Sequence, residues 1–255
     1  MVRYLLKRLE TVGKYFLFLG EICRCMFRRP FRFSLYLSEI ERLGINSISI
    51  ILLSGFAIGM IFALQMNTML GQFQAELATG AAVGWALTRE LGPLVTTLML
   101  IAKSGSAMAA ELGTMRVTEQ VDAMESMSIN VVHYLVVPKV VASVLIFPTL
   151  TILAVLVGTW GAYLISTTAF MLDSAVYLDF MFSNLKPWDT YSGLIKAAVM
   201  GGMVSSICCF YGLNAEEGGA KGVGDGATKA VVASSVSILL ADYVLASFMM
   251  KWVYL

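Results

Sequence analysis

Long apolar runs dominate the chain, and five of them are long enough to cross a lipid bilayer. A transmembrane helix needs about 20 mostly apolar residues. The candidate runs are residues 44–75, 77–102, 140–172, 197–215 and 230–250. All five are predicted to be helical, because an open sheet edge is not stable in hydrocarbon. The pattern therefore predicts an all-α integral membrane protein with about five transmembrane helices.

The first 43 residues have a different pattern, that of a basic amphipathic helix. Its apolar residues recur every three or four positions and form one stripe: Leu5, Leu9, Val12, Phe16 and Leu19. Such a helix is typical of segments that lie in the membrane interface, and Pro30 is predicted to end it. A cytoplasmic helix that packs on a partner protein is the alternative. We therefore divide the chain into an interfacial arm, 1–43, and a transmembrane domain, 44–255.

Lysine and arginine indicate the orientation of the chain. Nine of the 18 basic residues lie within 1–44, and cytoplasmic segments are enriched in such residues. The N-terminus is therefore predicted to be cytoplasmic, and segment 103–139 returns to the same side. The loop 173–190 carries three aspartates against one lysine and is predicted to face outward, and Lys196 flanks the next span. The loop 214–229, with a net charge of −1, does not fit the rule.

Composition narrows the classes of function. Charged residues make up 14% of the 255 residues and apolar residues 58%, which disfavours a nucleic-acid-binding surface. His133 is the only histidine, and the four cysteines have no zinc or disulfide spacing, so no metal site is predicted. Neither a G-x-S-x-G nucleophile motif nor a phosphate-binding P-loop occurs. The chain is therefore not expected to be an enzyme, has no predicted catalytic residue, and is not expected to hydrolyse ATP by itself.

Arg89 and Glu90 are charged residues within a predicted span. A charge inside the membrane costs several kcal/mol and is by default a functional candidate. Neighbours on a helix point about 100° apart, so each is expected to find its own partner on another helix or in a polar cavity. Gly92-Pro93 follows directly and is expected to loosen the helix. Asp242 in the last span is expected to pair with a lysine or with backbone donors. A structural ion pair that holds the helices together is the alternative to a functional site.

Segment 104–127 is too charged to cross the membrane and has the pattern of one amphipathic helix at the cytoplasmic surface, between spans two and three. On a helical wheel its polar stripe consists of Glu111, Thr114, Thr118, Asp122 and Glu125. The apolar side consists of Leu112, Val117, Val121 and Met124. A docking helix for a soluble partner and a simple solvated acidic face are both compatible with this pattern.

Several sequence blocks together resemble the MlaE/YrbE permease family. They are RELGP at Arg89–Pro93, KSGSAMAAELGTMRVTEQVDAMESM at Lys103–Met127, YLVVPK at Tyr134–Lys139, GFAIGM from Gly55 with Leu64-Gln65, and TKAVVASSVSILLADY near the C-terminus. The resemblance covers roughly residues 40–250. It implies the permease subunit of an ABC transporter that moves phospholipids between inner and outer membranes and maintains outer-membrane lipid asymmetry.

The same resemblance implies a set of partners. The family works as a homodimer with a cytoplasmic ABC ATPase, which would hold the ATP and magnesium, so this chain is expected to bind no cofactor. A ring of periplasmic MCE-domain proteins, a STAS-domain protein and the phospholipid substrate complete the implied assembly. The expected location is the bacterial inner membrane, with a cytoplasmic N-terminus, because no transit peptide precedes the arm.

Site residues carry over by position. Segment Glu111–Met127 resembles the coupling helix that seats in the ATPase, and the expected contacts are Glu111, Thr114, Arg116, Thr118, Glu119, Asp122 and Glu125. Arg89 and Glu90 resemble a charged pair near the translocation cavity, whose other expected residues are Leu64, Gln65, Met69, Phe73 and Lys229. Arg89 or Lys229 would attract the lipid phosphate. Lys229 stands where relatives can carry arginine, and a lysine lacks the fork for a bidentate contact.

Two other functions remain open from the residues. A gradient-driven secondary transporter or channel would use Arg89, Glu90 and Asp242 as an ion relay and would work in liposomes without an ATPase. A scaffold would only anchor partner proteins. For such a non-transporting scaffold, substitutions in the cavity would have no effect, whereas substitutions in the coupling helix would abolish assembly with the partners.

Overall fold

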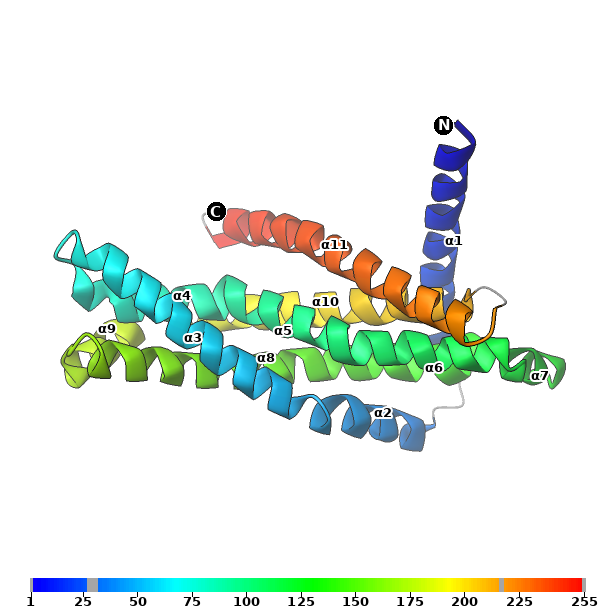
Figure 1. Cartoon of the computed structure of the whole chain (residues 1–255), viewed down its shortest axis with the longest axis horizontal. Coiled ribbons are helices and arrows are strands. Elements are labelled where there is room, and N and C mark those ends of the chain that lie inside the picture. Colours follow the sequence, from blue (N-terminus) through cyan, green and yellow to red (C-terminus); the bar gives the residue numbers. More distant parts are fainter. Residues whose placement is uncertain (1, 27–31, 216–217, 254–255) are drawn as a thin grey trace. The chain divides into compact units, whose positions relative to one another are not determined.

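Helices account for the secondary structure of the described chain. The computed structural model describes residues 2–26, 32–215 and 218–253, and within these ranges it contains no strand (Figure 1). Five helical segments are long and apolar enough to cross a membrane: Phe33–Gly71, Glu76–Val117, Val132–Thr168, Pro187–Leu213 and Ala220–Lys251. The predicted fold class and number of spans are confirmed. Pro30, the predicted end of the first helix, lies outside the described residues.

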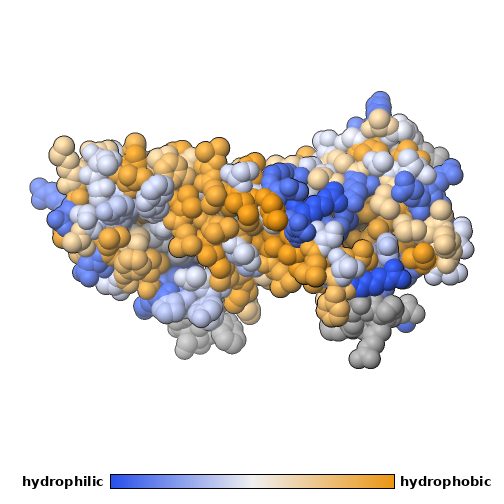
Figure 2. Space-filling model, turned by 90° about the horizontal axis from the view of Figure 1, so that it is seen from below, coloured by the Kyte–Doolittle hydropathy of each residue, from blue (hydrophilic) through white to orange (hydrophobic). Residues whose placement is uncertain are grey.

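The chain divides into two compact units, each assembled from three stretches of sequence. The first unit comprises residues 1–43, 101–143 and 201–237, and the second comprises 44–100, 144–200 and 238–255. Three long helices contribute residues to both: α8 (Val137–Thr168), α10 (Pro187–Leu213) and α11 (Ala220–Val253). Many large apolar side chains of these helices are exposed, and apolar side chains cover a large area of the face shown in Figure 2. Such a surface is stable in lipid but not in water.

Glycines bring α3 (Ile48–Gly71) close to α8 in the second unit. A Cβ atom added to Gly55 would lie 2.8 Å from the carbonyl oxygen of Ala154. One added to Gly59 would lie 1.9 Å from the carbonyl oxygen of Gly158. Only residues without a side chain permit this approach, in which the two backbones themselves make the contact.

The second unit also contains a run of short helical segments. They are η1 (Glu76–Ala78), α4 (Thr79–Ala86), η2 (Leu87–Leu91), α5 (Gly92–Leu100) and α9 (Ser174–Asn184). Of these segments, η1, α4 and α5 pack on α3. Helix α4 packs on α9, where a Cβ atom on Gly80 would lie 2.8 Å from the carbonyl oxygen of Tyr177. The side chain of Asp173 caps α9 by accepting hydrogen bonds from the amides of Ala175 and Val176.

The core of the first unit forms around α1 (Val2–Met26). Its buried members also come from α6 (Ser106–Val117), η4 (Val132–Val136), α8 and α10: Ile22, Cys25, Leu112, Val132, Val136, Val137, Val140 and Cys209. The ring of Tyr15 packs edge-on against Phe210 at 5.6 Å, and its hydroxyl lies 2.8 Å from the Ser206 hydroxyl. Burial raises the pKa of Tyr15, so its hydroxyl stays protonated. One face of α1 is thus firmly packed.

The other face of α1 carries the apolar stripe that the sequence singled out. Leu9, Val12 and Phe16 are 67%, 51% and 64% exposed. An exposed apolar stripe agrees with a helix that lies in an interface, and the interfacial location stays a prediction. The remainder of the predicted arm contains a second helix, α2 (Phe33–Ile45), which belongs to the first candidate membrane segment.

The prediction of one continuous helix over 104–127 is wrong. The first part is α6, which continues α5 through the π-helical turn η3 (Ile101–Gly105) and therefore belongs to the second candidate span. The second part is a separate short helix, α7 (Gln120–Ser126). Between them Glu119 has a φ of 59°, in the left-handed region. The break follows Val117-Thr118, two β-branched residues that favour helices weakly.

Candidate functional site

Arg89 and Glu90 lie in η2, a π-helical turn inside a candidate membrane span. The amide of Gly92 donates to the carbonyl oxygen of Leu87, five residues earlier, and Pro93 has no amide hydrogen to donate. The loosening expected at Gly92-Pro93 is confirmed. Single π-helical turns of this kind are frequent at functional sites, because they widen a helix locally and re-aim its side chains.

Helix α10 makes an unusually close contact with this turn. A Cβ atom on Gly193 would lie only 2.1 Å from the carbonyl oxygen of Thr88, so the two backbones touch. Asp189 lies four residues before Gly193 and Lys196 three residues after it, which places all three on one face of α10. Asp189 is 5% exposed and Lys196 only 1%. The close approach thus places two buried charges beside Arg89 and Glu90.

Each charge of the turn finds its own partner on α10, as the helix geometry predicted. The Nη1 atom of Arg89 lies 3.6 Å from Oδ1 of Asp189. The Nζ atom of Lys196 donates to Oε2 of Glu90 at 2.5 Å. The same Nζ lies 3.4 Å from Oδ1 of Asp242 on α11, which confirms a lysine partner for Asp242. One buried ammonium group is therefore shared by carboxylates from two other helical elements.

The charge balance of this cluster determines what it can bind. Two cations stand against three carboxylates, which gives a formal charge of −1. The Arg89 side chain is 11% exposed, and its guanidinium lies over the ring of Trp85 at 4.6 Å as well as beside Asp189. The Glu90 side chain is 39% exposed and is the most accessible member. Arg89 is thus engaged within the protein, and its contact with a lipid phosphate stays a prediction.

The sequence pattern did not identify Asp189 and Lys196 as site residues. The hydropathy pattern predicts an outer loop at Asp189 and places Lys196 at the flank of a span over 197–215. The helix in fact begins at Pro187, because proline suits the first turn of a helix, where its missing amide costs nothing. The available signal was the spacing of Asp189, Gly193 and Lys196, which share one helical face.

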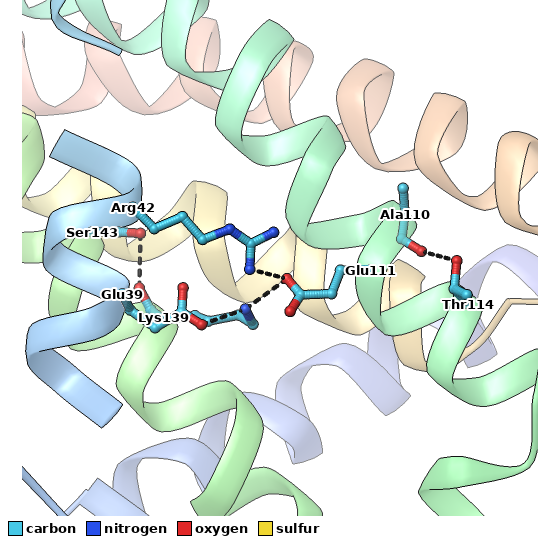
Figure 3. A network of polar contacts seen from close by, with 7 residues as sticks. All are labelled: Glu39, Arg42, Ala110, Glu111, Thr114, Lys139 and Ser143. Atoms are coloured by element: carbon cyan, nitrogen blue, oxygen red, sulfur yellow. Dashed lines mark hydrogen bonds and ion pairs between the residues drawn. The ribbon is translucent and has the colours of Figure 1, made fainter. Parts of the chain in front are cut away.

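A second charged cluster lies in the first unit, where Lys139 of α8 meets α2 and α6 (Figure 3). Its Nζ atom donates to Oε1 of Glu39 at 2.7 Å and to Oε2 of Glu111 at 2.9 Å. The guanidinium of Arg42 donates to the same oxygen of Glu111 at 2.8 Å. The Lys139 side chain is 2% exposed. Two cations and two carboxylates balance, and the cluster ties three helices together.

The predicted ATPase contacts are therefore separated by the structure. Glu111 points into the cluster of Figure 3. Arg116 pairs with Asp122 at 2.5 Å. The exposed members are Thr114, Thr118, Glu119, Asp122 and Glu125. Because the helix breaks at Glu119, these side chains do not form the single stripe expected from the wheel. Their contact with an ATPase stays a prediction.

The other predicted cavity residues do not belong to the cluster of Arg89 and Glu90. Near the end of α3, Leu64 is 50%, Met69 56% and Phe73 71% exposed, and Gln65 is exposed as well. Lys229 is exposed on α11. These residues form apolar and polar surface whose contact with a lipid stays a prediction.

Comparison with known proteins assigns the chain to a family. The family model described as permease MlaE matches residues 36–248. The chain belongs to the MlaE permease family. Both charged clusters lie inside the matched region, whereas α1 lies outside it. As a member of this family the chain is a multi-pass membrane permease and not an enzyme.

Individual relatives are similar over most of the chain. A probable ABC transporter permease protein of Rickettsia bellii is 38% identical over 242 residues, which cover 95% of this chain and 93% of the relative. The intermembrane phospholipid transport system permease protein MlaE of Haemophilus influenzae is 34% identical, covering 85% and 83%. The chloroplastic protein TRIGALACTOSYLDIACYLGLYCEROL 1 of Arabidopsis thaliana is 38% identical, covering 83% and 60%. These relatives give no support to a gradient-driven transporter.

Proposed function

We propose that this MlaE-family permease is the membrane subunit of an ATP-driven ABC transporter that moves phospholipids between the inner and outer membranes. The observation that carries the proposal is the similarity, over 85% of this chain, to a permease named for intermembrane phospholipid transport. The five candidate spans fit a permease. Because the sequence has no P-loop, the ATP and magnesium are assigned to a separate ATPase subunit. Movement of phospholipid in this system would maintain outer-membrane lipid asymmetry.

The ATPase would bind the cytoplasmic turn that follows the second span. Three carboxylates are exposed there, on Glu119, Asp122 and Glu125. Exposed carboxylates on a short, well-defined helix suit a basic or amide-lined cleft of a soluble partner. This assignment places the N-terminus in the cytoplasm and the chain in the inner membrane, in agreement with the basic arm. On the opposite side a ring of MCE-domain proteins would exchange lipid with the permease, and a STAS-domain protein would bind the ATPase.

The cluster around Lys196 would act as a two-state contact during transport. Its ammonium group lies 2.5 Å from Glu90 but 3.4 Å from Asp242, so the lysine is bonded unequally to η2 and α11. A small shift of α11 would exchange these partners and keep the buried lysine paired, since an unpaired buried charge costs several kcal/mol, while the released Glu90 is 39% exposed. Discrete alternatives of this kind let packed helices switch rather than deform. The acyl chains would meet apolar side chains such as Leu64, Met69 and Phe73.

A second copy of the chain would pack along α11. An apolar stripe with helical spacing runs along this helix, and its members are more than half exposed: Val232, Val236, Leu239 and Tyr243. Stripes of this kind on membrane helices pack on lipid or on another helix, and a homodimer would enclose a lipid cavity between its two copies. We expect a Leu239→Cys variant to form a disulfide between two copies, because the proposed dimer brings this position of both copies together.

The test is purification of the tagged chain from its own membrane, followed by reconstitution. We expect an ATP-binding protein to purify with the chain, and vesicles that contain both to transfer fluorescent phospholipid only when ATP is present. Charge reversal by Asp122→Lys with Glu125→Lys should remove the ATPase. Asp179→Lys, an exposed reversal on α9, is the matched control and should retain it. A chain that purifies alone and moves its substrate under an ion gradient would overturn the proposal.

A further inference from the structure

A small pocket of about 260 Å³ lies in the first unit, and none of its lining residues is a member of a charged cluster. Its walls are the start of α2, the turn that follows α7, and the η4–α8 junction. Backbone hydrogen bonds hold the turn, with the amide of Ser128 bonded to Glu125 and that of Ile129 to Met124, at 2.9 and 3.0 Å. Ser128 has a φ of 60°. The wall is therefore a defined turn, and the pocket is a built feature of the surface.

The pocket lies where two membrane segments begin. Arg32 immediately precedes the candidate span that starts at Phe33, and the turn ends just before the span that starts at Val132. Tyr36 and Tyr134, near the start of each span, both line the pocket. Tyrosine is concentrated at the level of the lipid headgroups, because its ring is apolar and its hydroxyl is polar. The two tyrosines favour a depth at the level of the headgroups, on the side that the basic arm predicts to be cytoplasmic.

The lining chemistry suits an anion with an apolar base. The guanidinium of Arg32 lies 5.1 Å from the centroid of the Tyr134 ring, a contact that orients it. Asn130 accepts a hydrogen bond from the amide of His133 at 2.8 Å. No lining residue in the described pocket is acidic, and the remaining wall is apolar, with Ile129 among its members. An arginine fork matches two oxygens of a phosphate group, and the apolar wall matches a glycerol backbone.

We propose that this pocket binds the phosphodiester headgroup of a cytoplasmic-leaflet phospholipid. Its volume is below the range of pockets that enclose a drug-sized ligand, so it takes the headgroup and leaves the acyl chains in the bilayer. Basic pockets between membrane helices on this side are typical sites for anionic headgroups. The bound lipid bridges α2 and α8 next to Lys139, which already joins the two helices through Glu39. The site does not rest on the proposed transport function, because the ligand is a structural lipid.

The test uses the full chain, purified in nonionic detergent with its copurifying partners and stripped of lipid. Dihexanoyl-phosphatidylglycerol, dihexanoyl-phosphatidylcholine and inorganic phosphate are titrated in parallel while bound adducts and the unfolding temperature are recorded. We expect phosphatidylglycerol to bind most tightly and to raise the unfolding temperature. Arg32→Gln should weaken this binding about fivefold, since one basic residue near an anionic surface contributes about 1 kcal/mol. Arg24→Gln removes an equal charge from an exposed position of α1 and should change little.

A photoreactive phosphatidylglycerol reports the location of the bound lipid. Crosslinks to peptides that span residues 128–138 are expected in the unaltered chain and should be lost in Arg32→Gln. Arg32→Lys keeps the charge without the fork and should bind with intermediate affinity, which keeps the test valid if Arg32→Gln folds poorly. Equal binding by Arg32→Gln and Arg24→Gln would overturn the proposal. Saturation by inorganic phosphate alone would also overturn the proposal and would identify a simple anion site. Release of a protein partner by Arg32→Gln, without loss of lipid, would overturn it too and would identify a protein interface.

Discussion

Substitution of Gly193 by alanine tests whether the contact between α10 and η2 positions the charged cluster. The added Cβ atom would lie 2.1 Å from the carbonyl oxygen of Thr88, whereas such atoms essentially never approach closer than 3.0 Å. The helix must therefore move by at least 0.9 Å. Overpacking of this kind costs about 1–3 kcal/mol. We expect Gly193→Ala to lower the free energy of unfolding by that amount.

The same displacement acts on the ion pairs. Asp189 and Lys196 flank Gly193, so a shift of α10 away from η2 lengthens both of their contacts. The distance from Arg89 to Asp189, now 3.6 Å, would exceed 4 Å, and the ion pair would be lost. Lys196 and Glu90, now 2.5 Å apart, would separate beyond an ordinary charge-assisted hydrogen bond. ATP-dependent phospholipid transfer should therefore fall along with stability.

The assay combines thermal unfolding in detergent with phospholipid transfer by reconstituted permease. Gly224→Ala is the matched control, because a Cβ atom at Gly224 has no neighbour within 4 Å. Alanine should stabilise that helix slightly, by up to about 1 kcal/mol. The reasoning is refuted if Gly193→Ala unfolds and transfers lipid like the Gly224→Ala control.

Three further predictions concern the buried charges and the helix contacts. Lys196→Met should lower the free energy of unfolding by about 3–5 kcal/mol in chemical unfolding, because it leaves two carboxylates without their lysine. Adding Asp242→Asn should restore part of the loss, and no restoration would show that Lys196 and Asp242 do not interact. Glu111→Gln should lower the unfolding temperature while Glu125→Gln leaves it unchanged, since of these two carboxylates Glu111 alone pairs with the buried Lys139; equal temperatures would count against the cluster of Figure 3. Gly59→Ala should destabilise by about 1–3 kcal/mol, measured by thermal unfolding, because its Cβ atom would lie 1.9 Å from a backbone oxygen, and an unchanged stability would exclude that contact.

Features that depend on a single helix were predicted well from the local sequence. The five spans follow from the length of the apolar runs, and the weak turn at Gly92-Pro93 follows from backbone chemistry. The separate partners of Arg89 and Glu90 follow from the angle between neighbours on a helix. These features depend on a residue and its neighbours within about one turn.

Helix boundaries were less predictable, because charged residues inside a helix lower its local hydropathy and shift the predicted ends. Asp189 and Lys196 read as loop and flank, yet they lie inside α10, where buried partners neutralise them. Segment 104–127 read as one surface helix, yet α6 continues the preceding span, and a left-handed residue at Glu119 separates it from α7. A charged side chain in a membrane helix is stable when another helix supplies its partner, and hydropathy does not register that partner.

The class of protein, the number of candidate membrane helices and the charged residues that need partners thus follow from the order of residues alone. The partners of those charges become visible once the helices are packed. Glu111, predicted to contact a partner protein, links α2, α6 and α8 in the structure, and Lys196 is the centre of the cluster that contains Glu90 and Asp242. Transfer of an apolar helix into lipid depends on that helix alone, whereas an ion pair depends on distances of a few ångströms between helices far apart in the chain. Glycines such as Gly193 set those distances, and their effect appears only when the helices are packed.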